Sequence, residues 1–163
     1  MLREISAGGV VVQKVGNSWE IAVIEPQREP ESTLKTDKKR QKQLLALPKG
    51  LVDPGEKADE TAIREVREET GIVAAKLAKL ADIKYVYVRS WGDKQRVFKI
   101  VSFYLLRYES GEMDEIKPEM RIEVKRALWI PLEGAERRLA YKGERDVVKL
   151  AQEYLESHPQ EAQ

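Results

Sequence analysis

Two short apolar, β-branched runs near the start of the chain predict a β-hairpin. The first run covers residues 8–12 and the second covers residues 20–24, and both have the length and composition that are typical of strands. The residues between them, Gly16, Asn17 and Ser18, favour a tight turn. We therefore expect two paired strands at the start of the fold.

Three later parts of the chain also have the apolar pattern of strands. Residues 44–47 form a short apolar run that stops at Pro48. Residues 83–88 and 97–106 predict a second hairpin at the centre of a sheet, and residues 127–130 predict a last strand. These strands alternate with segments of helical character.

Apolar residues recur at helical spacing over residues 59–70, 131–139 and 145–156. For the first helix, Asp59 is a candidate N-cap and Gly71 a candidate left-handed end. Its inward stripe is expected at Ala62, Ile63, Val66 and Thr70. Strands interleaved with two or three helices predict an α/β (α+β) fold, in which a mixed sheet carries helices on its faces.

The polar segment over residues 27–43 separates the first hairpin from the rest of the chain. It contains six basic residues, Arg28, Lys35, Lys38, Lys39, Arg40 and Lys42. Because it is long for a connection without structure of its own, we expect a flexible solvated loop, or else an arm that meets phosphates. A chain of 163 residues is sufficient for one core. We expect a single domain over residues 1–156 and a C-terminal tail over residues 157–163.

The overall charge and the rare residue types exclude several classes of function. Lys and Arg number 29 against 28 Asp and Glu, so no global field attracts nucleic acid or a membrane surface. The chain has no cysteine and one histidine, which excludes thiolate zinc sites and a cysteine nucleophile. With no long apolar run and no secretory pattern at the start, we expect a cytoplasmic protein that acts on a small molecule.

Three glutamates in the first predicted helix carry the strongest chemical signal. Glu65, Glu68 and Glu69 are spaced at i, i+3 and i+4, so they share one helix face. Like charges at this spacing destabilise a helix by roughly 0.2–0.5 kcal/mol per pair. A hard divalent cation such as Mg²⁺, or Mn²⁺, would remove the conflict and could bridge these carboxylates to substrate phosphates.

Two residues beside this acidic face suggest a structural support for it. Arg64 precedes Glu65, and Glu56 lies in the segment that leads into the helix. An ion pair between Arg64 and Glu56 would fasten that segment to the helix and orient the metal ligands.

Residues 50–72 match the Nudix box, Gly-x5-Glu-x7-Arg-Glu-U-x-Glu-Glu-x-Gly-U with U aliphatic, at every specified position. A chance match somewhere in the chain has a probability well below about one in a million. The chain therefore resembles the Nudix hydrolases. The resemblance implies the Nudix fold, a mixed sheet sandwiched between helices. It also implies a pyrophosphohydrolase whose metal ligands are Glu65, Glu69, Glu68 and the carbonyl of Gly50, with Glu56 and Arg64 as supports.

The resemblance also implies that a carboxylate removes a proton from the attacking water. This base is either Glu65, inside the box, or a residue from a later loop, for which we favour Glu119 and Glu123. With Glu69 as a ligand, these residues form the predicted catalytic set.

Residues around the box are similar to the branch that hydrolyses diadenosine tetraphosphate and other dinucleoside polyphosphates. Lys49 is expected to contact a phosphate, and Tyr85 and Tyr87 are suited to stacking on adenine. A lysine on an apolar strand, Lys99, is expected to line the cleft. The remaining candidates for substrate binding are Arg89, Arg96 and Tyr141.

Other functions remain open on the sequence alone. Within the enzymes, the alternatives are a nucleoside triphosphate pyrophosphatase of the 8-oxo-dGTP type and a diphosphoinositol polyphosphate hydrolase. A Nudix-fold nucleotide sensor is the alternative that is not an enzyme, although a pure sensor has no need of clustered, repelling carboxylates. Either a monomer or a homodimer is compatible with the sequence.

Overall fold

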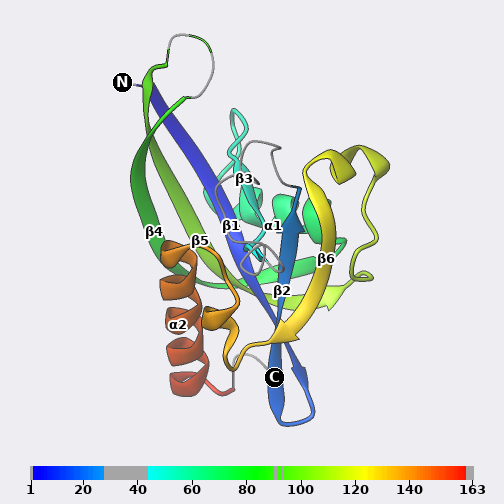
Figure 1. Ribbon diagram of the computed structural model, residues 1–163. Helices are drawn as coiled ribbons and strands as arrows, with labels where there is room; N and C mark the ends of the chain where they lie inside the picture. Colours follow the sequence, from blue (N-terminus) through cyan, green and yellow to red (C-terminus); the bar gives the residue numbers. More distant parts are fainter. Residues whose placement is uncertain (1, 28–43, 90–91, 93, 161–163) are drawn as a thin grey trace.

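Six strands form one mixed sheet with a helix on each face in the computed structural model, which describes residues 2–27, 44–89, 92 and 94–160 (Figure 1). The strands are β1 (Leu2–Val15), β2 (Ser18–Pro26), β3 (Lys49–Leu51), β4 (Val73–Val88), β5 (Arg96–Ser110) and β6 (Val124–Pro131). The helices are α1 (Ala58–Thr70) and α2 (Lys142–Ser157), with short 3₁₀ turns at Pro118–Ile122 and Ala135–Arg137. This arrangement confirms the predicted fold class.

The long strand β1 organises the sheet, whose order is β4-β5-β1-β2-β6. It runs parallel to β5 along one edge. Along its other edge it pairs antiparallel with β3 at Ser6–Gly8 and then with β2 at Val12–Val15. The short strand β3, which contains the first residue of the Nudix box, is thus hydrogen-bonded to β1 in the middle of the sheet. This pairing fixes its position in the fold.

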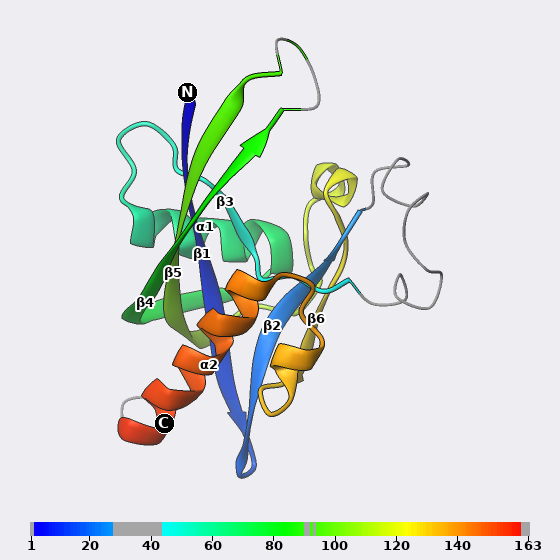
Figure 2. The same cartoon turned by 60° about the vertical axis from the view of Figure 1, so that its left-hand side comes forward.

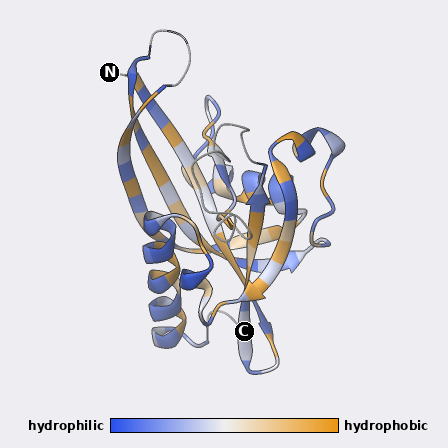
Figure 3. Ribbon diagram, in the orientation of Figure 1, coloured by the Kyte–Doolittle hydropathy of each residue, from blue (hydrophilic) through white to orange (hydrophobic). Residues whose placement is uncertain are grey.

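Alternate side chains of the central strands face two separate cores. Val10 and Val12 pack in a cluster with Val147 and Ala151 of α2, whereas Val11 packs in a cluster with residues of α1. The two helices therefore cover opposite faces of the sheet (Figure 2). In Figure 3 the strands carry orange, hydrophobic segments, whereas α2 is mostly blue, hydrophilic, on the side that is seen.

Both predicted hairpins are present, but the position of the second was partly wrong. β1 pairs with β2 and β4 pairs with β5. β4 begins at Val73, well before the predicted start, and lies at the edge of the sheet instead of its centre. Its residues alternate only weakly between buried and exposed positions, which is consistent with an edge location.

The predicted strand over residues 44–47 is not formed. Ala46 exchanges two backbone hydrogen bonds with Ile24, both 2.8 Å long, while the carbonyl of Leu45 accepts from the N–H of Ala140. Because these neighbours bond to different partners, only isolated bridges result. The strand lies a few residues later, at Lys49–Leu51.

The first helix is close to its prediction, but its start differs. Lys57 is the N-cap, and its N–H donates to the Glu60 side chain. Asp59, the predicted cap, lies in the first turn, where its carboxylate pairs with Lys76 at 2.9 Å. Gly71 ends the helix with a φ of 85°, as predicted. Of the predicted stripe, Ala62, Val66 and Thr70 are buried and Ile63 is half-buried.

The predicted helix over residues 131–139 is reduced to the 3₁₀ turn Ala135–Arg137. Gly134 has a φ of 79°, in the left-handed region, so a continuous helix cannot pass through it. The last helix is confirmed and is longer than predicted. Residues 28–43 of the predicted loop and residues 161–163 of the predicted tail lie outside the described residues. Within the described part of the chain, no helix has the length and apolar character of a membrane span.

Candidate active site

Gly50 in β3 lies directly against the carboxylate of Glu65 in α1. A Cβ atom added at Gly50 would lie 2.1 Å from Cδ of Glu65, far inside van der Waals contact. The antiparallel pairing of β3 with β1 holds the strand in this place. Position 50 therefore needs glycine, because only glycine lets the backbone approach the acidic helix so closely.

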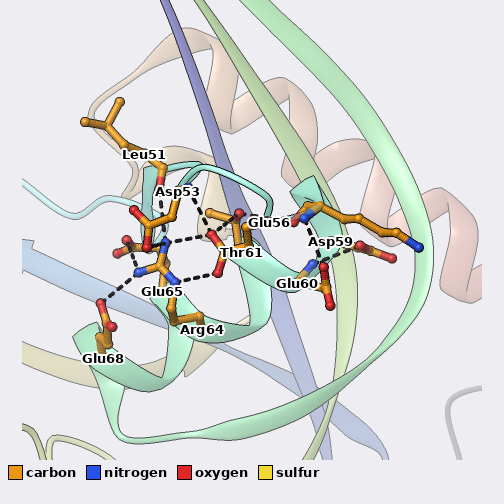
Figure 4. Close-up of polar contacts among 10 residues, drawn as sticks. Leu51, Asp53, Glu56, Asp59, Glu60, Thr61, Arg64, Glu65 and Glu68 are labelled. Carbon is orange, nitrogen blue, oxygen red and sulfur yellow. Dashed lines mark hydrogen bonds and ion pairs between the residues drawn. The ribbon is translucent and has the colours of Figure 1, made fainter.

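Arg64 joins the loop before α1 to the acidic face of the helix (Figure 4). Its Nε and Nη2 donate to the two oxygens of Glu56 at 2.7 and 2.9 Å. Nη2 also donates to the carbonyl of Leu51, and Nη1 donates to Glu65 at 2.9 Å and to Glu68 at 3.2 Å. The ion pair predicted between Arg64 and Glu56 is thus present, in a bidentate geometry that only arginine can provide.

The charges of this network stabilise one another. Hydrogen bonds from Arg64 and then from the Thr61 hydroxyl lower the pKa of Glu56 to about 2. The same contact with Glu56 raises the pKa of Arg64 above its ordinary value, although burial opposes this shift. Glu56 and Arg64 therefore remain charged across the physiological range, and every strong donor of the guanidinium has an acceptor.

Glu65 and Glu69 are buried beside each other, with 9% and 5% of their surface exposed. Burial raises the pKa of Glu69 to about 8, and the neighbouring charge of Glu65 adds to this effect. Burial also raises the pKa of Glu65, although Arg64 opposes the shift. Glu69 accepts the backbone N–H of Lys49 at 3.0 Å. Within the described residues it has no ion-pair partner.

Glu68 is more exposed than the other two glutamates and is directed toward Arg64. Among the described residues, no three acidic or histidine side chains converge into a ready-made metal site. The donor chemistry nevertheless fits a hard divalent cation, because two buried carboxylates with raised pKa values lie beside a backbone segment. Glu65, Glu69 and the carbonyl of Gly50 would be its ligands, and Glu68 would need to turn away from Arg64 to join them.

A polar cleft of about 330 Å³ opens beside Glu69. Glu123 belongs to its wall, and the charge of Glu123 contributes to the raised pKa of Glu69 and of Glu65. The hydroxyl of Ser6 is buried and has no hydrogen-bond partner within the described chain. The other polar and charged residues that line the cleft are Glu4, Lys49, Lys99 and Tyr141.

An aromatic cleft of about 340 Å³ lies next to the polar cleft. The two clefts share Lys49 and Tyr141. Apart from these two residues, the aromatic cleft is lined by Ile83, Tyr85, Val101, Phe103, Gly143 and Glu144. One part of the site is therefore charged and the other is apolar and aromatic, with a lysine between them.

Lys49 is a half-buried cation and not an exposed turn residue. Its Nζ lies 2.8 Å from Oε2 of Glu144 and 5.5 Å from the centre of the Tyr141 ring. Burial lowers the pKa of Lys49, but Glu144, together with Tyr141 and Glu69, raises it, and the net shift is upward. Glu144 was not predicted as a site residue, because a glutamate near the start of an amphipathic helix has the sequence pattern of a solvated residue.

Some of the other predicted site residues lie near the two clefts, and others lie away from them. Tyr87 donates a hydrogen bond to Glu4 from the neighbourhood of the polar cleft. Arg89 and Arg96 lie at the far end of the β4–β5 hairpin and line neither cleft. Glu119 lies in a separate hollow with Glu68 and Arg67. Of the two residues favoured as the distal base, only Glu123 lies in the polar cleft.

Several known proteins are similar in sequence to this chain, and three of them show how far the similarity extends. A Mycobacterium tuberculosis protein named mutator protein MutT4 is 36% identical over 155 residues, which cover 95% of this chain and 57% of that protein. A Bacillus subtilis protein named 8-oxo-dGTP diphosphatase is 47% identical over 62 residues, 37% of this chain and 39% of that one. A mouse asymmetrical bis(5'-nucleosyl)-tetraphosphatase is 70% identical over 30 residues, 18% of this chain and 20% of that one. The chain thus spans less than two thirds of each relative.

Among solved structures, a C. elegans Ap4A hydrolase binary complex superposes with a TM-score of 0.65 at 21% identity. The match covers 94% of this chain and 98% of that one, and it supports the fold. The family model of the NUDIX domain matches residues 10–151, which include β3, α1 and most of α2. Together with the complete motif on β3 and α1, this match shows that the chain belongs to the Nudix hydrolase family.

Proposed function

We propose that this protein uses a divalent cation to hydrolyse a diphosphate linkage in a dinucleoside polyphosphate such as diadenosine tetraphosphate. The observation that carries the proposal is the pair of adjoining clefts. The polar cleft beside Glu69 suits a polyphosphate chain, and the aromatic cleft suits a nucleoside. Lys49 and Tyr141 lie where a nucleoside would join its phosphates.

In this proposal the acidic helix holds the cation and the neighbouring residues fix the ligands. Glu65, Glu69 and the Gly50 carbonyl would bind magnesium, which supplies an acidified water and neutralises phosphate charge when it is bound. Arg64 and Glu56 orient Glu65 through the hydrogen bonds described above. Glu123 would accept the proton of the attacking water, since it lines the same cleft as Glu69.

The remaining residues would bind the rest of the substrate. Tyr85 and Tyr141 would hold one base, and stacking of this kind contributes about 1–3 kcal/mol per base. Lys99 has no ion-pair partner within the described residues and lines the polar cleft, so its ammonium can meet a phosphate oxygen. Water would add to phosphorus as the bond to the bridging oxygen breaks, yielding a nucleoside monophosphate and a nucleoside triphosphate.

The mouse tetraphosphatase, which is 70% identical over 30 residues, is a relative whose name gives this substrate class. A second candidate is a nucleoside triphosphate pyrophosphatase of the 8-oxo-dGTP type. The similarity to the Bacillus subtilis diphosphatase extends over about twice as many residues as the mouse match and favours it. A single aromatic cleft would serve either substrate, so product analysis is needed to separate the two.

The test is product analysis with purified protein in magnesium or in EDTA. The panel contains diadenosine tetraphosphate, 8-oxo-dGTP, ATP, ADP-ribose and diphosphoinositol pentakisphosphate. We expect magnesium-dependent conversion of diadenosine tetraphosphate to ATP and AMP, absent in Glu69→Gln and retained in Glu153→Gln, an exposed control on α2. If 8-oxo-dGTP is turned over faster than diadenosine tetraphosphate, the protein is instead the second candidate, a nucleoside triphosphate pyrophosphatase. No turnover of any compound by folded, magnesium-binding protein would favour a nucleotide sensor.

A further inference from the structure

Glu144 is the most completely satisfied acidic side chain near the two clefts. It is 4% exposed. Its Oε1 accepts the backbone N–H of Leu47 at 2.7 Å, and its Oε2 accepts from Nζ of Lys49 at 2.8 Å. These contacts connect the first turn of α2 to the segment that leads into β3. One carboxylate thus fixes both the backbone and the side chain of the segment that precedes Gly50.

The position of the ion pair links the two halves of the site. Lys49 lines both clefts, its own N–H donates to Glu69, and its ammonium lies over the ring of Tyr141. An unpaired lysine at this place would turn toward any nearby phosphate, since its stem is flexible. With Glu144 in place, the ammonium has one preferred position between the clefts.

We propose that Glu144 is a positioning residue that holds the Lys49 ammonium at the junction of the two clefts, where it meets the substrate in its reacting geometry. The inference rests on the proposed function, because it assumes a substrate that occupies both clefts. Both oxygens of Glu144 are engaged by protein donors, the Leu47 N–H and the Lys49 ammonium, so its role is assigned through Lys49.

The role predicts a joint change in two kinetic constants, a lower kcat and a lower KM. Glu144→Gln keeps an oxygen for the Leu47 N–H but removes the charge that holds Lys49. The released ammonium can then bind ground-state phosphate more freely while it loses its reacting geometry. We expect kcat to fall about tenfold and KM to fall with it, whereas loss of folded protein would lower the apparent kcat and leave KM unchanged.

A binding measurement tests the same role without catalysis. ATP binding in EDTA, followed by calorimetry, should tighten by about twofold to fivefold in Glu144→Gln, because a negative charge near the phosphates has been removed. AMP and adenosine binding provide the comparison, and the gain should be smallest for adenosine, which has no phosphate. Asp146→Asn is the matched control, since Asp146 lies on the same helix and pairs with Lys142 at the surface.

The pairing itself is tested with Lys49→Met. In that background, Glu144→Gln should cause no further fall in kcat, and the double variant leaves neither charge of the pair buried. A rise in KM as the main effect, equal changes in Asp146→Asn, or a further tenfold loss in the double variant would overturn the proposal. If the wild type hydrolyses nothing in the panel, the proposed function fails, and the ATP-binding arm still decides whether Glu144 restrains Lys49.

Discussion

Two of the three buried glutamates of the site, Glu144 and Glu69, lie on helices that cover opposite faces of the sheet, and their surroundings differ. Glu144, on the α2 side, accepts a backbone N–H and a lysine ammonium. Glu69, on the α1 side, accepts one backbone N–H and lies beside Glu65, a second buried carboxylate. A buried charge with its partners present stabilises the fold, whereas one without a cation carries an electrostatic cost. The difference distinguishes a structural glutamate from one that is suited to receive a metal.

The largest expected effect comes from Glu69→Gln. The variant should lose about 10³-fold or more in kcat with magnesium, because a metal ligand is removed. In EDTA the same variant should be more stable by about 1 kcal/mol, or roughly 2–4 °C in Tm, since it removes a carboxylate whose charge is disfavoured by burial and by the neighbouring Glu65. Kinetics and calorimetry measure the two effects.

Glu144→Gln should change the stability in the opposite direction to Glu69→Gln. It removes the partner of the Lys49 ammonium, so its Tm in EDTA should fall. If both variants changed Tm in the same direction, the distinction between the two glutamates would be wrong.

The next largest expected effect is the loss of kcat when the proposed general base, Glu123, is replaced. Glu123→Gln should lower kcat about 10²-fold, the usual range for loss of a general base. Glu119→Gln should change kcat by less than about threefold, because Glu119 lies outside the polar cleft. Equal losses in the two variants would show that both carboxylates, or neither, take part. The pH profile of kcat for each variant reports which group titrates.

A smaller effect is expected from Arg64→Lys, which keeps the charge but loses the bidentate contact with Glu56. We expect the apparent affinity for magnesium to fall about tenfold and the free energy of unfolding to fall by about 1–3 kcal/mol. Magnesium titration of activity and urea unfolding measure these changes. Lys142→Arg is a suitable control, since Lys142 is an exposed cation on α2 with a surface partner. A variant as stable and as active as the wild type would remove the supporting role of Arg64.

The smallest effect is a dependence of stability on pH in the apo protein. The pKa of Glu69 is about 8 in the fold, above its ordinary value of 4.5. Between these values the folded state binds the proton and the unfolded state does not, so stability falls as pH rises through this window. We expect Tm in EDTA to decrease by a few degrees more in the wild type than in Glu69→Gln. Magnesium should reduce this decrease, because it takes the place of the proton.

The sequence predicted the local parts of this site better than the distant ones. The contact between Arg64 and Glu56 lies within one motif, and helical spacing alone places Glu65 and Glu69 on one face. Glu144 is 95 residues from Lys49, so no local period relates them. Glu119 and Glu123 could not be separated either, since the 3₁₀ turn Pro118–Ile122 that places them apart has no strong sequence pattern.

In the fold, too, local features were predicted better than those that depend on distant parts of the chain. Strands with strong apolar runs, such as β2 and β5, were predicted near their observed positions. The first half of β4 was missed, because lysines interrupt its apolar residues at the edge of the sheet. The apolar residues at 44–47 have the composition of a strand, but their partners are a strand and a loop, which only the tertiary structure determines.

The contact between Gly50 and Glu65 has a consequence for variation at this locus. Every single-nucleotide missense change at codon 50 introduces a side chain, and its first carbon would overlap the Glu65 carboxyl group. A residue with no reactive group should therefore be as intolerant of substitution in a saturation library as the glutamates themselves. Drift among natural alleles is then expected in the surfaces that select the substrate, while this glycine stays constant.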